Sequence, residues 1–277
     1  DQITKNDGES DTTINFGTTT ADLALPGYSY VITDAADNTY KSIDDFVYTA
    51  KEADLQDYTV TYTAEPVTVA VHFDTTMLTK EQQATVNATD GEISGKTDAD
   101  YTTAQGQTTV PAVPGYTFTV TNATGKTVAQ DATSDLDLTT VSGAFTVNPD
   151  GTPKNDHFTV VYTPVEQVVT VNTDTTVLNA TQKTQVSVPA TATITGKTDA
   201  LNTTATGATT VTAVPGYTFT VTDAAGHKMV EHSEANFDLT TVPGQFAVNP
   251  DGTLQNPSYT VVYTPEVQQK TVNVTFP

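Results

Sequence analysis

Apolar and polar side chains alternate along most of this chain with a period of two residues. In the segment 67–73, valines and a phenylalanine at every second position alternate with threonine, alanine and histidine. Segments 116–120 and 158–162 follow the same pattern. This alternation is typical of antiparallel strands that have one buried face and one wet face. The pattern therefore predicts a mainly β chain.

Helical patterns are scarce, and turn chemistry is frequent. Segment 78–87 contains the good helix formers Lys80 to Gln83 and predicts one short helix. The stretch 181–189, which follows the next copy of the opening strand, has valines at 186 and 188 and predicts a strand. Pro114-Gly115 and the Asn-Pro-Asp-Gly run at 148–151 supply turns between strands.

Long segments of the sequence return about a hundred residues later. Val113–Thr121 is repeated unchanged as Val214–Thr222, and Gly95–Ala99 is repeated as Gly196–Ala200. Two further pairs are Asn148–Thr152 with Asn249–Thr253, and Thr159–Pro164 with Thr260–Pro265. A fixed period of this kind indicates a tandem array of similar domains.

The repeat divides the chain into four parts. Residues 67–166 form one unit and residues 167–268 form the next. Residues 1–66 are a divergent and shortened copy, and residues 269–277 resemble the first strand of a truncated further unit. The joints between units span about four residues and contain a proline, which leaves little slack. We therefore expect an elongated and fairly stiff array.

Composition narrows the classes of protein that this chain can belong to. The net charge is −22, and all 11 basic residues are lysines, so nothing provides a basic surface for nucleic acid. No run of 18 apolar residues is present, so we expect no membrane insertion. The absence of cysteine excludes a disulfide framework and any thiolate nucleophile. No secretory signal is present, so we expect a mature protein or a fragment.

The recurring residues follow a recognisable order along the first unit. They are Asp74, Gly95-Lys96, Tyr101-Thr102-Thr103, Gly115-Tyr116, Phe145 with Asn148 and Asp150, and the closing strand 160–162. In this order the chain resembles the mucus-binding repeats of lactobacilli and related Gram-positive bacteria. The resemblance covers residues 67–268 well and the first 66 poorly. It implies β-grasp-like domains in an extracellular protein that is anchored to the cell wall.

Catalytic chemistry has little support in the sequence. The histidines at 72, 157, 227 and 232 have Asn172, Ser258, Lys126 and Asp131 as their counterparts in the other unit. A catalytic or metal-binding histidine would recur in both copies, so we expect surface histidines in variable loops and no enzyme. We expect no cofactor, and the one cofactor that remains open is calcium.

Aspartates are the only candidate calcium ligands. Asp74, Asp137 and Asp150 recur as Asp174, Asp238 and Asp251. Calcium needs six to eight oxygens from several segments, and capping of local turns explains these residues more simply. A covalent cross-link between Lys96 and Asn148, which also recur, is a second open alternative.

Aromatic residues are the usual surface on which sugars stack. The period-two placement predicts that most of them lie in the core: Tyr116, Phe118, Tyr162, Tyr217, Phe219 and Tyr263. Tyr101 has Asn202 as its counterpart, so we expect Tyr101 to be exposed and to be the best candidate for ligand binding.

Two functions remain open at this stage. The first is a monomeric adhesin whose units each bind host mucin or other glycoprotein glycans weakly and gain avidity from the array. The alternative is a passive stalk that projects another adhesive domain from the cell wall. A strongly acidic chain would repel sialylated or sulfated glycans at short range, so contact would use neutral sugars or a bridging cation.

Overall fold

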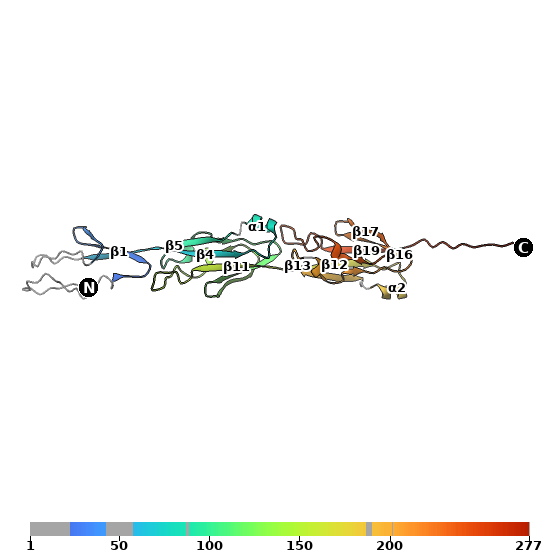
Figure 1. Cartoon of the computed structure of the whole chain (residues 1–277), viewed down its shortest axis with the longest axis horizontal. Helices are drawn as coiled ribbons and strands as arrows, with labels where there is room; N and C mark the ends of the chain where they lie inside the picture. The colour runs from blue at the N-terminus through green and yellow to red at the C-terminus, as the bar shows by residue number, and fades with distance from the viewer. Residues whose placement is uncertain (1–22, 43–57, 87–88, 187–189, 201, 277) are drawn as a thin grey trace, which may run out of the picture.

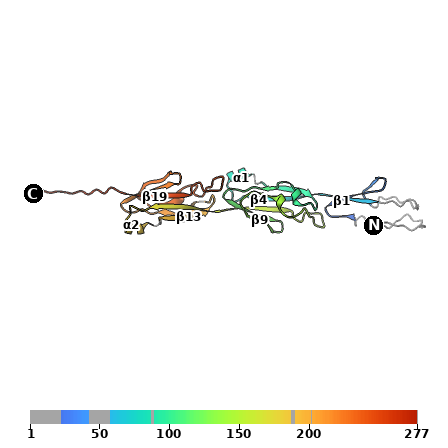
Figure 2. The ribbon, with the colours of Figure 1, turned by 180° about the vertical axis from the view of Figure 1, so that it is seen from behind.

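The computed structural model describes residues 23–42, 58–86, 89–186, 190–200 and 202–276. The molecule is long and narrow, and its sheets follow one another along the long axis (Figure 1). The amino-terminal sheet lies at one end and an extended carboxy-terminal segment leaves from the other, as the view from behind also shows (Figure 2). Strands make up 46% of the structure and helices 10%, so the predicted β class is confirmed.

The first sheet has three short antiparallel strands. These are β1 (Tyr28–Thr33), β2 (Thr39–Tyr40) and β3 (Thr59–Ala64), in the order β2-β1-β3. Tyr30 of β1 lies opposite Tyr62 of β3, and the two rings contact at 6.0 Å between centroids. Ile32 is the only fully buried apolar side chain of this sheet among the described residues.

The second sheet has six strands in the order β6-β5-β4-β11-β8-β9. Its members are β4 (Pro66–Asp74), β5 (Gly91–Lys96), β6 (Gln105–Gly106), β8 (Tyr116–Asn122), β9 (Thr127–Ala132) and β11 (His157–Pro164). The central pair β4 and β11 is parallel, and all the other pairs are antiparallel. The two strands β7 (Thr109–Val110) and β10 (Leu136–Asp137) pair separately beside it.

The third sheet repeats this order as β14-β13-β12-β19-β16-β17. Its members are β12 (Glu166–Asp174), β13 (Thr191–Lys197), β14 (Thr206–Gly207), β16 (Tyr217–Asp223), β17 (Lys228–Ser233) and β19 (Ser258–Pro265). The central pair β12 and β19 is again parallel. The small pair beside it is β15 (Thr210–Val211) with β18 (Phe237–Asp238).

Each six-stranded sheet buries one face. Val69 and Val71 of β4 are 1% and 0% exposed, and Phe118 of β8 is 1% exposed. Three short 3₁₀ helices each bury one side chain: Tyr101 in Tyr101–Thr103, Leu138 in Leu138–Thr140 and Leu239 in Leu239–Thr241. A fourth lies at Asn202–Thr204. The predicted aromatic core is confirmed except at Tyr217, which is half-buried.

Two short helices follow the opening strands. The predicted helix is present as α1 (Lys80–Val86), and position 87 lies outside the described residues. The strand predicted for 181–189 is wrong over its first part, because α2 (Ala180–Gln185) lies there, and positions 187–189 lie outside the described residues. Asn179 accepts a hydrogen bond from the Gln182 backbone at 2.9 Å, and the Gln182 side chain accepts one from the Asn179 backbone at 2.9 Å. This capping box fixes the first helical turn before the valines begin.

The carboxy-terminal segment 267–276 runs on without a strand partner and is exposed throughout. Val272, Val274 and Phe276 are 73%, 66% and 84% exposed. None of the helices in the described ranges has the length and apolarity needed to cross a membrane.

We predict that two neighbouring valines of β11 contribute very different amounts to the free energy of unfolding. Val160 is 0% exposed and Val161 is 39% exposed. Val160→Ala should lower the free energy of unfolding of its domain by about 2 to 3 kcal/mol, because it leaves a cavity. Val161→Ala should cost only about 0.5 to 1 kcal/mol, mainly through strand propensity. Urea unfolding followed by circular dichroism measures both, and equal losses would contradict the assigned faces.

We also predict a loss of stability in alkali. Burial raises the pKa of Tyr162 and of Tyr263 from 10.0 to about 12. Below pH 10 both folded and unfolded states keep these protons; above it the unfolded state releases them first, so stability falls until about pH 12. The loss should reach about 3 kcal/mol for each tyrosine. Urea unfolding across this range tests the decline, which Tyr162→Phe should reduce in the first six-stranded domain only.

Candidate functional site

The most distinctive structure in this chain is the joint between successive sheets. A single residue, Val165, separates the end of β11 from the start of β12, which is shorter than the expected joint of about four residues. The Val165 N–H donates to the Gly115 carbonyl at 2.9 Å, and the Val165 carbonyl accepts from the Thr198 N–H at 2.9 Å. The linking residue is therefore bonded to the domain before it and to the domain after it.

The same arrangement joins the three-stranded sheet to the first six-stranded sheet. Glu65 donates to the Gly27 carbonyl at 2.8 Å and accepts from the Thr97 N–H at 3.0 Å. The hydroxyls of Thr97 and Thr198 also donate to their linking carbonyls, each at 3.2 Å. The same pattern of hydrogen bonds thus occurs at both joints, although the sheets that they connect differ in size.

Glycine is required at this joint for two reasons. Gly115 has φ +78°, a conformation that L-residues adopt at a cost. A Cβ at this position would lie 2.6 Å from Cγ2 of Thr198. Thr198 is 2% exposed and bonded to Val165, so it has no room to move aside. Gly27 is equivalent, with φ +79° and Thr97 at 2.6 Å.

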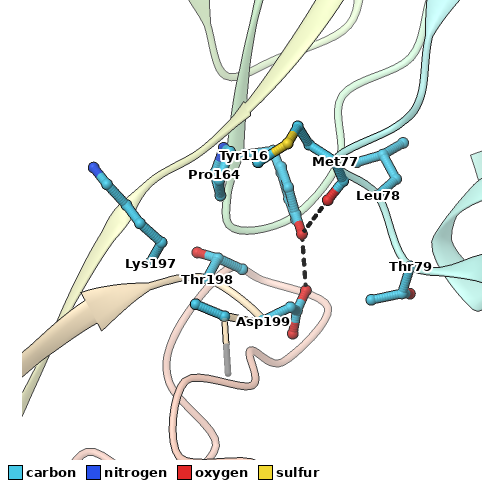
Figure 3. Close-up of a pocket in the computed structure, with 9 residues that line it drawn as sticks. Met77, Leu78, Thr79, Tyr116, Pro164, Lys197, Thr198 and Asp199 are labelled. Atoms are coloured by element: carbon cyan, nitrogen blue, oxygen red, sulfur yellow. Dashed lines mark hydrogen bonds between the residues drawn. The ribbon is translucent and has the colours of Figure 1, made fainter. Parts of the chain in front are cut away.

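A tyrosine and an aspartate close the joint on the outside. The Tyr116 hydroxyl lies 3.1 Å from the Met77 carbonyl and 3.2 Å from Oδ2 of Asp199, two acceptors that share its one hydrogen (Figure 3). Gln82 of α1 donates from Nε2 to the same oxygen at 2.8 Å. Burial, followed by the Asp199 charge, raises the pKa of Tyr116, so this tyrosine stays a donor. At the first joint the Tyr28 hydroxyl donates to Asp98 at 3.0 Å.

The two aspartates are held by the backbone of the domain to which they belong. Asp98 and Asp199 have φ of +60° and +55°, which aspartate tolerates better than most residues. Their N–H groups donate to the carbonyls of Phe145 and Phe246 at 3.0 and 3.2 Å. Each carboxylate is thereby presented to the preceding domain from a fixed turn.

A cavity of about 310 Å³ lies at the second joint, between the two six-stranded domains. Met77, Leu78 and Pro164 provide its apolar wall. The Lys197 side chain points away from the polar cluster, while Asp199 faces Tyr116 (Figure 3). Tyr116 and Asp199 are bonded to each other across the joint, so this part of the cavity is organised to hold two domains together.

The aspartates considered as calcium ligands cap their own turns. Asp74 and Asp150 each accept from the N–H and hydroxyl of the threonine two residues later, and Asp137 accepts from the Thr139 N–H at 2.9 Å. Asp174, Asp238 and Asp251 do the same in the next domain, with backbone bonds of 2.9 to 3.0 Å. Bonds from the threonines lower the pKa of Asp74, Asp137 and Asp150. Within the described residues no three acidic or histidine side chains converge as metal ligands.

The expectation of an exposed Tyr101 is wrong. Its side chain is 4% exposed and packs edge-on against Phe145 and Phe158, with ring centroids 5.0 and 5.8 Å apart. Asn155 donates to its hydroxyl at 3.3 Å. The 3₁₀ helix Tyr101–Thr103 turns the ring inward, which the alternation of strands could not indicate.

The second domain, which has asparagine in place of this tyrosine, also differs from the first at two buried positions. Gln245 and Tyr259 stand where the first domain has Ala144 and Phe158, and they are 1% and 0% exposed. Two larger side chains therefore occupy the core of the domain that has Asn202 in place of Tyr101. The difference between the copies is a change in core packing, and it gives no indication of a ligand.

The remaining candidates are placed at the surface. His72, His157 and His232 lie on strands, contrary to the expected loops, while His227 lies in the loop between β16 and β17. His72 contacts Asp90 at 3.0 Å, and the ring of His157 lies 5.7 Å from that of His72. Lys96 is exposed, and the Asn148 amide donates to Thr152 and Pro153 within its turn at 3.1 and 3.3 Å.

Comparison of the chain with family models, with curated proteins and with solved structures finds no match.

We predict that replacing Gly115 is harmful mainly because of the close approach of Thr198 at the joint, and less because of strain in the turn. Gly115→Ala and Gly216→Ala place a Cβ at nearly the same φ, +78° and +80°, so each should cost about 1 kcal/mol in backbone strain. Only Gly115→Ala also collides with Thr198, whereas the nearest atom to a Cβ at Gly216 is 3.9 Å away.

Hydrogen exchange of the Val165 and Thr198 amides measures the effect on the joint. Gly115→Ala should remove their protection while the sheets stay folded, and Gly216→Ala should leave both amides protected. Unchanged protection in Gly115→Ala would show that the close approach does not hold the joint.

Proposed function

We propose that this chain is a stiff section of an extracellular bacterial surface adhesin. Its units are non-catalytic β-grasp-like repeats, and its partners are host mucin or related glycoproteins. The observation that carries this proposal is a linking residue whose backbone is hydrogen-bonded to the domain on each side. It occurs at Glu65 and again at Val165. A joint of this kind holds successive domains in line and projects their surfaces away from the cell.

The strand order supports the β-grasp assignment. In a β-grasp domain the first and last strands lie side by side and parallel at the centre of a mixed sheet. β4 with β11, and β12 with β19, are placed in this way. The sequence repeat and the matching orders of the two sheets together support a tandem array of one domain type.

The surface chemistry supports weak contact with neutral glycans. The strand aromatics are mostly buried, which leaves few of them for stacking on sugars. Threonines on the strands, such as Thr68 and Thr163, are exposed and provide hydroxyls for hydrogen bonds. The charge of −22 opposes binding of sialylated or sulfated chains at short range. Each unit would then bind weakly, and a rigid array would gain affinity by presenting several units at fixed spacing.

The second candidate is a stalk without binding of its own. It is favoured by the cavity at the joint, where Tyr116, Gln82 and Asp199 are bonded to one another and present no open ligand site. In this case the described domains act only as spacers for another part of the surface protein.

Binding to immobilised mucin separates the two functions. We predict that the chain with both six-stranded domains binds saturably, and that a single domain binds at least about tenfold more weakly because avidity is lost. Gly115→Ala is a matched control, because it disturbs the joint and leaves the surface of each domain intact. Saturable binding that is equal for one and two domains would contradict the avidity argument, and no binding would support the stalk.

A further inference from the structure

The free end of the second six-stranded domain repeats the receiving half of the joint. Gly216, Tyr217 and Gln182 correspond to Gly115, Tyr116 and Gln82. We propose that this end is a preformed docking face for the Thr-Asp turn of a further unit of the same kind. The inference rests on the proposed array function and names the partner of its next joint.

The backbone half of the joint is already in place. The Glu266 N–H donates to the Gly216 carbonyl at 2.9 Å, as Val165 does to Gly115. The Glu266 carbonyl is equivalent to the acceptor that Val165 offers to Thr198, and it has no partner among the described residues. At Gly216 the space that Thr198 fills against Gly115 is open. A following threonine would therefore find both its acceptor and its space.

The side chains are also set in their joint geometry. The Tyr217 hydroxyl lies 3.1 Å from the Val177 carbonyl and 3.3 Å from Oε1 of Gln182. The Tyr116 hydroxyl likewise lies 3.1 Å from the Met77 carbonyl. Oε1 of Gln182 caps the Asn179 N–H at 2.9 Å, as Oε1 of Gln82 caps Thr79 at 2.9 Å. These bonds direct the two hydroxyls and the two amides before any carboxylate is present.

One polar donor at this end awaits a partner. Gln82 uses its Nε2 to bind Asp199 at 2.8 Å, whereas Nε2 of Gln182 has no acceptor in the described part of the chain. Tyr116 is 3% exposed under the next domain, while Tyr217 is only half-buried. An aspartate on a turn like that of Asp199 would accept from Gln182 and Tyr217 and cover the ring.

The geometry favours a further unit of this chain over an unrelated partner. The docked threonine and aspartate must follow from a linking residue that is itself bonded to Gly216, so the occupant enters as a continuation of the same backbone. The segment after Glu266 carries exposed apolar residues at 272, 274 and 276, alternating as in β4. Such a segment loses its exposed apolar surface when it becomes the opening strand of a folded domain.

A three-domain chain tests the proposal directly. A copy of residues 166–268 is placed after Glu266, so that its own Thr-Asp turn faces Gly216. Residual dipolar couplings then report whether successive domains share one alignment. We expect the second and third domains to align together, as the first and second do across Val165. Aspartate-to-alanine replacement at the copied position of Asp199 should abolish the common alignment of the third domain.

Matched variants separate this inference from the proposed function. Tyr217→Phe should reduce the common alignment of the second and third domains by the same fraction as Tyr116→Phe reduces that of the first and second. Tyr217→Phe should leave the alignment of the first and second domains unchanged. A third domain that tumbles independently while the first two stay aligned would overturn the docking face and leave the array function standing. Independent alignment of the first and second domains would instead overturn the proposed stiff array.

Discussion

The parallel pairing of the first and last strands in each six-stranded sheet is the interaction on which the shape of the molecule depends. β4 and β11 run side by side in one direction, with Ala70 opposite His157 and Asp74 opposite Val161. The chain therefore enters the domain at one end of the sheet and leaves it at the other. An antiparallel central pair would return the chain to its entry side. Because β12 and β19 are paired in the same way, successive domains follow one another in a line (Figure 1).

This directionality brings together groups that are far apart in the sequence. The end of β4 leads into α1, so Gln82 lies at the exit of the first domain beside Tyr116. Asp199 arrives there from the entry of the next domain. One linking residue bonded on both sides then limits rotation between the domains more strongly than a proline-containing linker would by itself. The order of the joint comes from directed hydrogen bonds and from a glycine that permits close approach.

The sequence predicted the strands well and the local exceptions poorly. Alternation placed Val69, Phe118 and Val160 on the buried faces, because the side-chain period of a strand is independent of what it packs against. It missed α2, where two hydrogen bonds between Asn179 and Gln182 cap the first helical turn. The signal was present as an Asn-x-x-Gln spacing. Tyr101 was misplaced because one 3₁₀ turn decides the direction of its ring.

By itself the sequence determined the β class, the period of the repeat, the turn residues and the acidic, cysteine-free surface. These follow from neighbours within a few residues or from direct comparison of one copy with another. Only the tertiary structure decided which strands lie at the centre of each sheet, and hence that Tyr116, Gln82 and Asp199 form one cluster. The repeated Pro-Gly-Tyr motif suggested only a turn, and the Gly-Lys-Thr-Asp motif was recognisable only as a repeated segment. The two motifs contact each other only because of the parallel pairing. It places the end of one domain, where the chain leaves, next to the start of the following domain.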